Sequence, residues 1–349
     1  PTSLAPIPCG TGSLGRLRSF SPQVVSSMFL APTNEAEVLN VIGSLKSYNS
    51  CGWDGISPNV LKFCGHQLAY PVSILINQSL EQGKFPSKLK FANVYPLHKK
   101  NDSHLLNDFR PVALVSTLSK IYEKIVLSRL SSHLSRFHII SPHQYGFQKG
   151  KSTLSALYDF TNQIMRSLDE SRRTMGVFCD LSKAFDCVDH SILLDKLSHY
   201  GVRGIALQWF HSFLSGRYQK VTLNSSSGPI SSSFMLSQRG VPQGCILSPV
   251  LFLLYINDLH YEGKDCHMNL FADDVALLIK APNATTLENS FNSVIKSLTN
   301  WFECNGLLLN KGKTHCLNFG LIDSTQNCQR SSALQLTNHS PTTKFLGVI

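Results

Sequence analysis

Hydrophobic residues recur along the chain at two kinds of spacing. Apolar residues three and four positions apart predict amphipathic helices, and short apolar runs between turn-forming residues predict strands. Helices are predicted after a cap at Asn34, at 57–82 with a break near Pro71, and at 117–137, 190–200, 204–215, 247–259 and 284–304. Strands are predicted at 91–97, 175–181, 218–223, 233–237, 268–279 (two strands around a two-acid turn), 316–319 and 344–349. The two strands that flank the loop 224–230 are expected to pair.

Helices and strands alternate without a regular strand–helix–strand rhythm. That order predicts an α+β fold rather than a parallel α/β sheet. Residues 1–50 are expected to form an N-terminal lead-in with one short helix, because their first part is rich in Ser, Pro and Gly. At ~150 residues per domain, the 349 residues predict about two domains.

The composition narrows the class of protein only in part. A hydrophobic content of 42% with 15% charged residues predicts an ordered, globular chain. Lys and Arg number 32 against 22 Asp and Glu, and the net charge of +10 favours a polyanionic partner, although many basic proteins bind no nucleic acid. The chain starts without Met and ends inside a predicted strand, so we expect a fragment of a longer protein.

The ten cysteines predict free, mostly buried thiols in a reducing compartment. None of them forms a C-x₂-C pair, and the equal spacing of Cys304, Cys316 and Cys328 matches no zinc module. The longest apolar run, 250–256, is too short to cross a membrane, and no signal peptide is visible. We therefore expect an intracellular protein, in the nucleus or the cytoplasm, with no membrane partner.

Two adjacent carboxylates, Asp273 and Asp274, lie between two apolar segments. Like charges this close repel each other, and partial burial adds a desolvation cost, so a bound cation would stabilise the pair. Asp is also a common turn residue, and a plain surface turn explains the pair equally well. From this motif alone, a metal site and a turn are both open.

A third carboxylate, Asp180, ends the apolar strand predicted at 175–181. The segment between Asp180 and Asp273 holds enough helix and strand to bring the two strands together. Mg²⁺ takes oxygen ligands from few carboxylates together with phosphates. The three aspartates therefore predict a site for two Mg²⁺ ions, with Mn²⁺ as a substitute. A single Asp at the edge of a sheet is commonplace, and alone it indicates no site.

Residues 238–249 form a loop rich in Gly and Pro ahead of the helix predicted at 247–259. Glycines let a substrate approach the backbone, and the start of a helix favours a phosphate. Gln243 is a polar side chain between the two glycines of this loop. An ordinary loop leading into a helix accounts for the same residues.

These three motifs, in this order, resemble reverse transcriptases of non-LTR retrotransposons, the LINE-type and jockey-like elements. The Phe271-Ala272-Asp273-Asp274 motif alone is weak, but the ordered set is specific and covers about residues 35–349. The blocks that carry the resemblance are 52–56, 83–86, 94–100, 107–114, 120–130, 144–153, 180–190, 240–258, 271–274, 309–314 and 344–347.

The resemblance implies a role for each matching residue. Asp180 and Asp273 are expected to bind both metal ions, together with the backbone carbonyl of Leu181. Asp274 is expected to be a weaker third carboxylate. The residues expected at the dNTP are Arg110 and Lys99 (or Lys100) at the phosphates, Gln243 at the nucleotide, Phe185 as a steric gate against the ribose 2′-hydroxyl, and Lys313 as proton donor to pyrophosphate.

Purely structural roles for these residues also stay open. Phe185 can be a core side chain, Gln243 can stabilise its loop, and the basic residues can form a solvated surface. Asp186 and Asp189 are expected to turn the chain and cap the helix at 190–200, and His190 to make a structural hydrogen bond. Two residues near the end, Phe345 and Leu346, are expected to form a primer grip or to pack in the core.

The resemblance implies a right-hand polymerase fold, with 51–175 as the fingers and upstream helices, 176–349 as the palm, and some interleaving. An antiparallel palm sheet packed on helices would carry the three aspartates, and the thumb would be absent or truncated. The implied activity is RNA-directed DNA polymerisation with an RNA template, a DNA primer and dNTPs, in a ribonucleoprotein. The alternatives are a group II intron-type or domesticated enzyme of the same fold, and a decayed or truncated copy that binds RNA without catalysis.

Overall fold

The computed structural model describes residues 23–98, 109–225, 228–263, 265–319, 338–339 and 345–346. The described part of the chain forms two compact units. Unit 1 contains Ile140–Ile192 and Phe252–Ile349, and unit 2 contains Gln23–Ile139 and Leu193–Leu251. Both units contain helices and antiparallel strand pairs, so the chain has the mixed α and β content that its sequence predicts.

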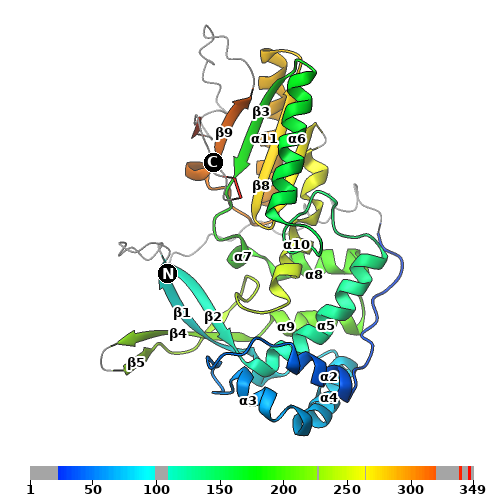
Figure 1. Ribbon diagram of the computed structural model, residues 1–349, viewed down its shortest axis with the longest axis vertical. Coiled ribbons are helices and arrows are strands. Elements are labelled where there is room, and N and C mark those ends of the chain that lie inside the picture. The colour runs from blue at the N-terminus through cyan, green and yellow to red at the C-terminus, as the bar shows by residue number, and fades with distance from the viewer. Residues whose placement is uncertain are drawn as a thin grey trace. The chain divides into compact units, whose positions relative to one another are not determined.

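Unit 1 is built on a five-stranded sheet in the order β10-β9-β3-β8-β7 (Figure 1). Neighbouring strands pair antiparallel, except for β10 and β9, which are parallel. The strands are β3 (Arg173–Cys179), β7 (Cys266–Phe271), β8 (Asp274–Ala281), β9 (His315–Phe319) and β10 (Asn338–His339). β3 and β8 therefore lie side by side in the middle of the sheet.

Helices cover both faces of this sheet, with α6 (Thr153–Asp169) and α11 (Ala284–Cys304) on opposite sides (Figure 1). On the α6 face, Phe160 packs with Phe178 and Ala276. Successive residues of a strand face opposite sides, so a strand covered on both faces must be apolar throughout. β8 meets this condition, because five consecutive residues from Val275 onward are buried. Shorter elements of this unit are α7 (Ala184–Cys187), η3 (Asn257–Gly263) and η4 (Lys311–Lys313).

Unit 2 holds a second sheet, in the order β2-β1-β4-β5 with β6 paired to β4. β1 and β4 are parallel, and the other pairs are antiparallel. The strands are β1 (Phe91–His98), β2 (Phe109–Val115), β4 (Arg217–Ser225), β5 (Gly228–Ser231) and β6 (Met235–Ser237). The helices are α2 (Glu35–Gly43), α3 (Pro58–Phe63), α4 (Gly65–Gln82), η1 (Ser87–Lys90), α5 (Thr117–Arg136) and α9 (Ile205–Leu214). Two further helices, α8 (His190–His199) and α10 (Ser248–Ile256), contain the boundaries between the units.

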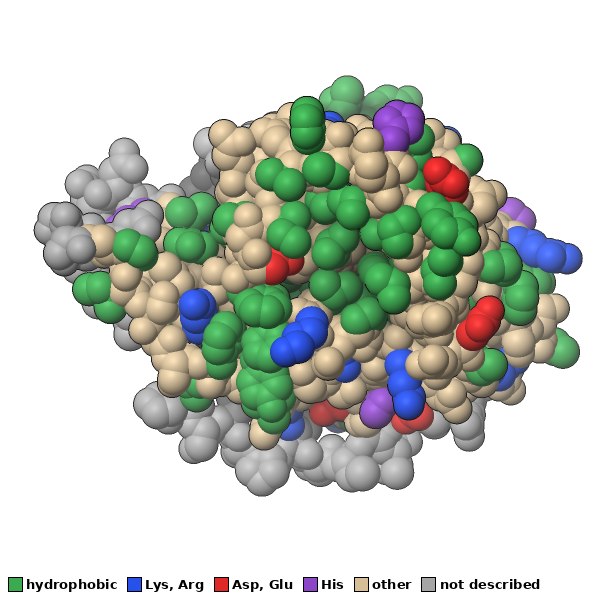
Figure 2. Space-filling model, turned by 90° about the horizontal axis from the view of Figure 1, so that it is seen from below, with side chains coloured by type: hydrophobic (Ala, Val, Ile, Leu, Met, Phe, Trp, Pro, Cys, Tyr) green, Lys and Arg blue, Asp and Glu red, His purple; other side chains and the backbone are tan. Residues whose placement is uncertain are grey.

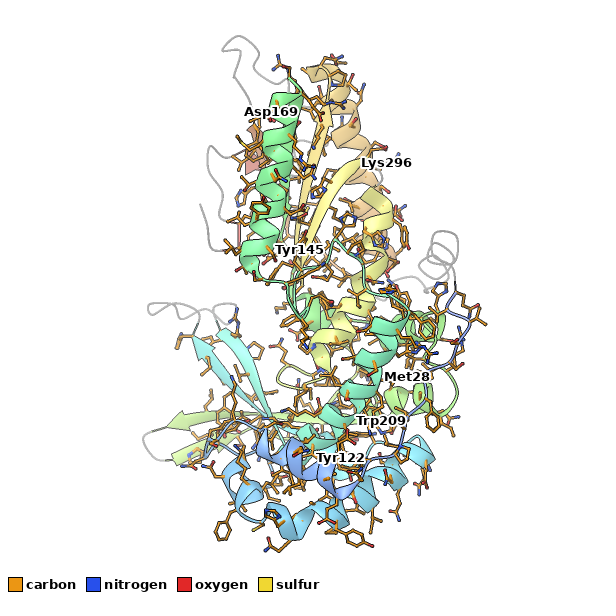
Figure 3. All side chains as sticks on the ribbon, turned by 45° about the vertical axis from the view of Figure 1, so that its right-hand side comes forward. Met28, Tyr122, Tyr145, Asp169, Trp209 and Lys296 are labelled. Carbon is orange, nitrogen blue, oxygen red and sulfur yellow. The ribbon has the colours of Figure 1, made fainter. Side chains whose placement is uncertain are left out.

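Aromatic side chains form the core of unit 2, where Figure 3 labels Tyr122 and Trp209. Phe85 meets Tyr122, Trp209 and Phe213 edge-to-face, with ring centroids 6.1, 5.4 and 5.2 Å away. The indole N–H of Trp209 donates to Ser79 Oγ at 3.0 Å. The buried ring therefore keeps its one polar atom hydrogen-bonded, as buried Trp usually requires.

Most predicted elements are confirmed, with their ends shifted by a few residues. Asn34 caps α2, because its side chain accepts a hydrogen bond from the backbone N–H of Glu37 at 2.9 Å. The strands around the loop 224–230 do pair, as β4 and β6. However, part of that loop is itself a strand, β5, and the strand β2 and the helix α6 were not predicted.

The predicted break near Pro71 is wrong. α4 continues through Pro71, and the chain turns instead at Cys64, which ends α3 and precedes α4. Proline removes one hydrogen bond, the one to the carbonyl four residues earlier, and this carbonyl belongs to Gln67. Gln67 and Pro71 are both exposed, so water can satisfy the carbonyl and the helix survives.

The two compact units do not follow a boundary at 175/176. Residues 193–251, expected with the palm segment 176–349, belong with 23–139 in unit 2. The reason is a long-range pairing, since β4 lies parallel to β1 and pairs Tyr218 with Phe91. Such a pairing leaves no periodic signal in either segment. The assignment of the units to fingers and palm stays a prediction.

Part of the surface is apolar, as Figure 2 shows. On α3 and α4, the exposed hydrophobic residues are Val60, Phe63, Tyr70, Ile74 and Leu75. The described part of the chain contains no helix of the length and hydropathy needed to cross a membrane. The described cysteines are all free thiols, as predicted, but of these only Cys179, Cys245 and Cys316 are buried, so the expectation that most are buried is wrong for this part of the chain. Cys9 and Cys328 lie outside the described residues.

Candidate active site

Asp273 and Asp274 lie at the tip of the β7–β8 hairpin. The last strand pair joins Phe271 to Asp274, so the connecting loop consists of Ala272 and Asp273. Ala272 has a left-handed φ of +55°, and the favoured two-residue hairpin turns need such a φ at their first loop residue. Asp273 therefore lies in the turn, and Asp274 begins β8.

Strand pairing places Asp180 beside this hairpin tip. β3 and β8 are antiparallel, and their last pair joins Cys179 to Val275. Carried one residue further, the same register sets Asp180 opposite Asp274, and directly opposite residues have Cβ atoms about 5 Å apart. Three aspartates from distant parts of the sequence thus meet at one end of the unit 1 sheet.

The negative charges of the aspartates at this end of the sheet repel one another, which affects the pKa of Asp274. Desolvation raises the pKa of Asp274 to about 6, and the negative charges of Asp273 and Asp180 add to the rise. Lys313 offsets part of this charge, with its Nζ 3.8 Å from Asp180 Oδ2. Because the Lys313 side chain is 69% exposed, the ion pair contributes about 1 kcal/mol at most. A bound cation would relieve the repulsion that remains.

Replacing Asp274 by asparagine is expected to stabilise the metal-free protein at neutral pH. The pKa of Asp274 is about 6 in the folded chain and 3.8 as its ordinary value. The contribution of Asp274 to stability is therefore fully present below pH 3.8 and is lost as the pH rises through 6, where the folded form must carry the charge. Thermal unfolding at pH 7.5 should show a Tm raised by roughly 2–4 °C in the variant.

The pH and metal dependence of this difference provide its control. The gain should shrink as the pH falls from 6 and vanish below 3.8, where Asp274 is protonated in both states. Millimolar Mg²⁺ should also reduce it by stabilising the wild type. Asp265→Asn, at an exposed position before β7, should leave the Tm unchanged. A lower Tm for Asp274→Asn at pH 7.5 would show that the repulsion is unimportant.

A cavity of about 530 Å³ opens beside Asp180 and Asp274. Phe178 of β3 and Asp180, which directly follows the strand, share the face covered by α6 if the strand geometry continues, since side chains two residues apart in a strand point the same way. The cavity is lined by Thr153, Phe178, Cys179, Asp180, Phe271, Asp274, Val275, Lys313, His315, Phe345 and Leu346. Apolar and charged side chains thus share one concave surface, as in many substrate sites.

Phe345 and Leu346, at the predicted primer grip, both line this cavity. The ring of Phe345 also lies 5.4 Å from that of Phe160 and 5.2 Å from that of Phe178, between centroids. Phe345 therefore packs in the core and borders the site at once. The rest of the strand predicted at 344–349 lies outside the described residues.

The backbone after β3 is held so that the carbonyl of Leu181 is left available. Asp180 O accepts from Asn310 N at 2.8 Å, and Ser182 N donates to Leu308 O at 2.9 Å. These two bonds flank the antiparallel bridge between Leu181 and Leu309. In this pattern the bridged residue directs its own N–H and C=O away from its partner strand. The metal-binding role of the carbonyl of Leu181 stays a prediction.

Phe185, the predicted steric gate, lies in α7 and stacks on Phe252 of α10. The ring centroids are 4.3 Å apart, and the planes differ by 19°. Phe252 is fully buried, whereas Phe185 is half-buried. A fixed ring with one free edge can exclude a bulky group, which a mobile ring cannot do as well.

Asp189, between α7 and α8, hydrogen-bonds to the backbone at the start of α8, as predicted. Asp189 Oδ1 accepts from the backbone N–H of Ser191 at 2.9 Å and of Ile192 at 3.2 Å, which caps the start of α8. Asp186 lies within α7 and His190 opens α8. Their predicted structural roles stay predictions.

Two other predicted site residues belong to unit 2. Arg110 is exposed on β2, and Gln243 lies in the loop before α10. Gly244 has a φ of +92°, and a Cβ there would come within 2.3 Å of Ala113 O. The loop of Gln243 therefore packs against the strand that carries Arg110. Lys99, like its alternative Lys100, lies outside the described residues.

Glu123 of α5 anchors this loop, a function that the sequence analysis missed. Its Oε2 accepts from the backbone N–H groups of Ile246 at 2.6 Å and Leu247 at 3.2 Å, just before α10. Burial raises the pKa of Glu123, and these donors with Ser119 and Arg217 oppose the rise. The sequence holds Glu123 within a motif block but gives no sign that its partners lie before α10.

The three aspartates fit divalent cations in charge and in donor type. Among the described residues, no three His, Cys, Asp or Glu side chains already converge closely enough to hold a metal ion. Mg²⁺, however, keeps several waters and takes only one or two carboxylates together with substrate phosphates. Desolvation and the negative charges of Asp273 and Asp180 raise the pKa of Asp274, and a cation would oppose that rise. Binding of a divalent cation at this cluster stays a prediction.

Comparisons with known proteins point the same way. The family model described as "Reverse transcriptase (RNA-dependent DNA polymerase)" matches residues 97–349. The chain is 28% identical over 313 residues to the probable RNA-directed DNA polymerase from transposon BS of Drosophila melanogaster, covering 85% of this chain and 33% of that protein. It is 27% identical over 337 residues to the RNA-directed DNA polymerase from mobile element jockey of the same species, covering 94% and 36%.

A third relative is the probable RNA-directed DNA polymerase from transposon X-element of Drosophila melanogaster, 27% identical over 262 residues, covering 73% of this chain and 28% of that protein. The chain thus spans about a third of the length of these curated relatives. The family match includes all three aspartates and the loop of Gln243. The chain therefore belongs to the reverse transcriptase (RNA-dependent DNA polymerase) family, and its relatives are polymerases of non-LTR retrotransposons.

Proposed function

We propose that this chain is the polymerase part of a non-LTR retrotransposon protein and copies an RNA template by extending a DNA primer with dNTPs. One observation carries the proposal: Asp180, Asp273 and Asp274 meet at one end of the unit 1 sheet, and two of them border a cavity. The chain belongs to the reverse transcriptase family, which supports polymerisation as the reaction at this acidic cluster.

The two units would divide the work of a right-hand polymerase. Unit 1, with its antiparallel sheet between α6 and α11, would be the palm. Unit 2 would be the fingers, because it carries Arg110 for the triphosphate and Gln243 for the incoming nucleotide. In this proposal the palm interleaves with the fingers along the chain, since residues 193–251 belong to unit 2.

The chain's own residues would prepare the site for two Mg²⁺ ions, with Mn²⁺ as a substitute. Asp180 and Asp273 would hold both ions, with the carbonyl of Leu181 and the carboxylate of Asp274 completing the set. When bound, such ions lower the pKa of the primer 3′-hydroxyl and stabilise the charge on the leaving pyrophosphate. Lys313 lies 3.8 Å from Asp180, and from there it would donate a proton to the pyrophosphate.

Binding of template and primer would rest largely on charge. The chain carries a net charge of +10, and contacts to phosphates release counterions. Affinity for nucleic acid should therefore fall steeply as the salt concentration rises. Bases of the single-stranded template would be held by stacking on exposed aromatic rings.

Primer extension tests the proposal. The chain is incubated with poly(rA)/oligo(dT), dTTP and Mg²⁺, and the elongated DNA is measured with and without EDTA. We expect Mg²⁺-dependent elongation that EDTA abolishes and that high salt reduces. Binding of the RNA–DNA hybrid without any elongation in Mg²⁺ or Mn²⁺ would instead support a non-catalytic RNA-binding protein.

A further inference from the structure

A short segment, residues 143–146, which we call the strap, lies along the free edge of the β7–β8 hairpin. Tyr145 N donates to Leu270 O at 2.7 Å, and Leu270 N donates to His143 O at 2.9 Å, so the strap pairs with β7 in parallel. β7 is the edge strand of the unit 1 sheet. Figure 3 labels Tyr145 near the end of α6 that is opposite to Asp169.

One side chain of the strap reaches the hairpin tip. Gln144 is only 1% exposed. Its Oε1 accepts from Gly146 N at 2.8 Å and from Ala272 N at 3.1 Å. Ala272 is the first loop residue of the hairpin and directly precedes Asp273. A single buried oxygen thus ties the strap to the turn that carries the acidic pair.

The fit around this oxygen is close. A Cβ on Gly146 would lie 2.4 Å from Ala272 N, so only glycine lets the strap approach the tip. The other end of the Gln144 amide, Nε2, is buried and has no hydrogen-bond partner in the described part of the chain. A buried polar atom left unpaired costs stability. The hydrogen bonds described for the Gln144 amide are therefore all made by its oxygen.

The strap is itself held in place. Lys151 Nζ donates to Pro142 O at 2.5 Å and to Gln144 O at 2.8 Å, and it lies 4.5 Å from the centre of the Tyr145 ring. An ammonium group over an aromatic face is a favourable contact. Gln144 therefore projects from a fixed backbone, so its side chain can hold the turn in one position.

The turn has a backbone conformation that must be held by contacts from outside it. Ala272 has a φ of +55°, a conformation that L-residues rarely adopt and that the surrounding contacts must maintain. If the turn relaxed, the carboxylates of Asp273 and Asp274 would change direction. Small displacements of catalytic groups can lower a rate by about 10²-fold.

We propose that Gln144 is a positioning residue, which holds the β7–β8 turn so that Asp273 and Asp274 can bind cations. The expected effect of Gln144 on catalysis rests on the proposed polymerase function. Its expected effect on the conformation of the turn does not depend on that function. Both hydrogen bonds described for the Gln144 side chain go to backbone N–H groups and not to the carboxylates. Gln144 acts on the backbone N–H of Ala272.

Two substitutions test the contact from its two sides. Gln144→Met keeps the length of the side chain and removes the acceptor, and Gly146→Ala forces the strap away from the tip. Amide hydrogen exchange, measured in the full chain without nucleotide, should become about tenfold faster at Ala272 in both variants. Amides of β3 should keep their wild-type rates.

Each substitution has a matched control away from the turn. Gln163→Met in α6 also removes a glutamine acceptor, the one that Lys280 Nζ reaches at 3.0 Å near the far end of β8. Gly43→Ala adds a Cβ that would meet nothing within 4 Å. Both controls should leave the exchange rate of Ala272 at its wild-type value.

The same variants are then compared in primer extension. We expect kcat to fall by roughly ten- to a hundredfold and the Mg²⁺ concentration for half-maximal rate to rise, with the KM for dNTP little changed. A purely structural loss would lower the fraction of active enzyme without moving the Mg²⁺ requirement. The Mg²⁺ titration therefore separates positioning from simple destabilisation.

Each outcome decides one claim. Wild-type exchange at Ala272 in Gln144→Met overturns the inference, and so does faster exchange with wild-type kcat and Mg²⁺ requirement. If the wild-type chain fails to extend primers, the proposed function falls, while the exchange rates still show whether Gln144 holds the turn. If Gln144→Met does not fold, Gly146→Ala carries the comparison, and normal exchange and kinetics in that variant overturn the inference.

Discussion

Asp273→Asn is expected to lower the rate of primer extension by at least about 10³-fold, because it removes a negative charge from the centre of the proposed metal site. The substitution is nearly isosteric, and Asp273 lies in a turn and not in the core. The fold should therefore be kept, and the thermal midpoint should not fall. The rate is measured on poly(rA)/oligo(dT) with saturating dTTP and Mg²⁺, at equal concentrations of folded protein.

Asp265→Asn is the matched control for this experiment. Asp265 directly precedes β7, at the end of that strand away from the turn, and it is exposed. It should extend primers at the wild-type rate. Similar rates for Asp273→Asn and the wild type would remove the catalytic assignment, and with it the polymerase function of this acidic cluster.

Phe185→Ala is expected to weaken discrimination against ribonucleotides by roughly 10²-fold. The ring of Phe185 is fixed by its stacking on Phe252, with centroids 4.3 Å apart. A fixed ring beside the sugar of the incoming nucleotide would collide with a 2′-hydroxyl, and alanine would leave room for it. The ratio of kcat/KM for dTTP and for UTP on poly(rA)/oligo(dT) measures this effect.

Two further variants sharpen the test of the gate. Phe252→Leu should weaken discrimination to a smaller degree, because Phe185 keeps its ring but loses its support. Phe63→Ala removes an aromatic ring that is 90% exposed on α3 and should leave the ratio unchanged. An unchanged ratio for Phe185→Ala would assign that ring to packing alone.

Local patterns in the sequence determine many of the elements. The helices α2, α5, α9 and α11 follow from apolar residues at helical spacing, and Asn34 caps α2 as its position predicts. These signals are strong because each is written within one short segment. Pro71 shows the limit of local rules, since a proline at an exposed position of α4 is tolerated where a break was predicted.

The candidate site was partly readable from the sequence as well. Three carboxylates at the ends of apolar strands indicated a metal site, and the order of the motifs indicated the family, which the family match confirms. Gln144 and Glu123 carried no such signal. Each lies in a motif block, but each acts through backbone N–H groups of a distant segment, namely Ala272 and the residues before α10.

The sequence by itself therefore determined the family of the chain, most of its helices and strands, and the identity of the acidic residues. Only the tertiary structure decided that β3 and β8 pair in a register that sets Asp180 opposite Asp274. It also decided that β4 joins β1, so that residues 193–251 belong to unit 2. The physical reason is range: periodicity and capping depend on neighbours a few residues apart, whereas strand register and side-chain anchors depend on which distant segments are buried together.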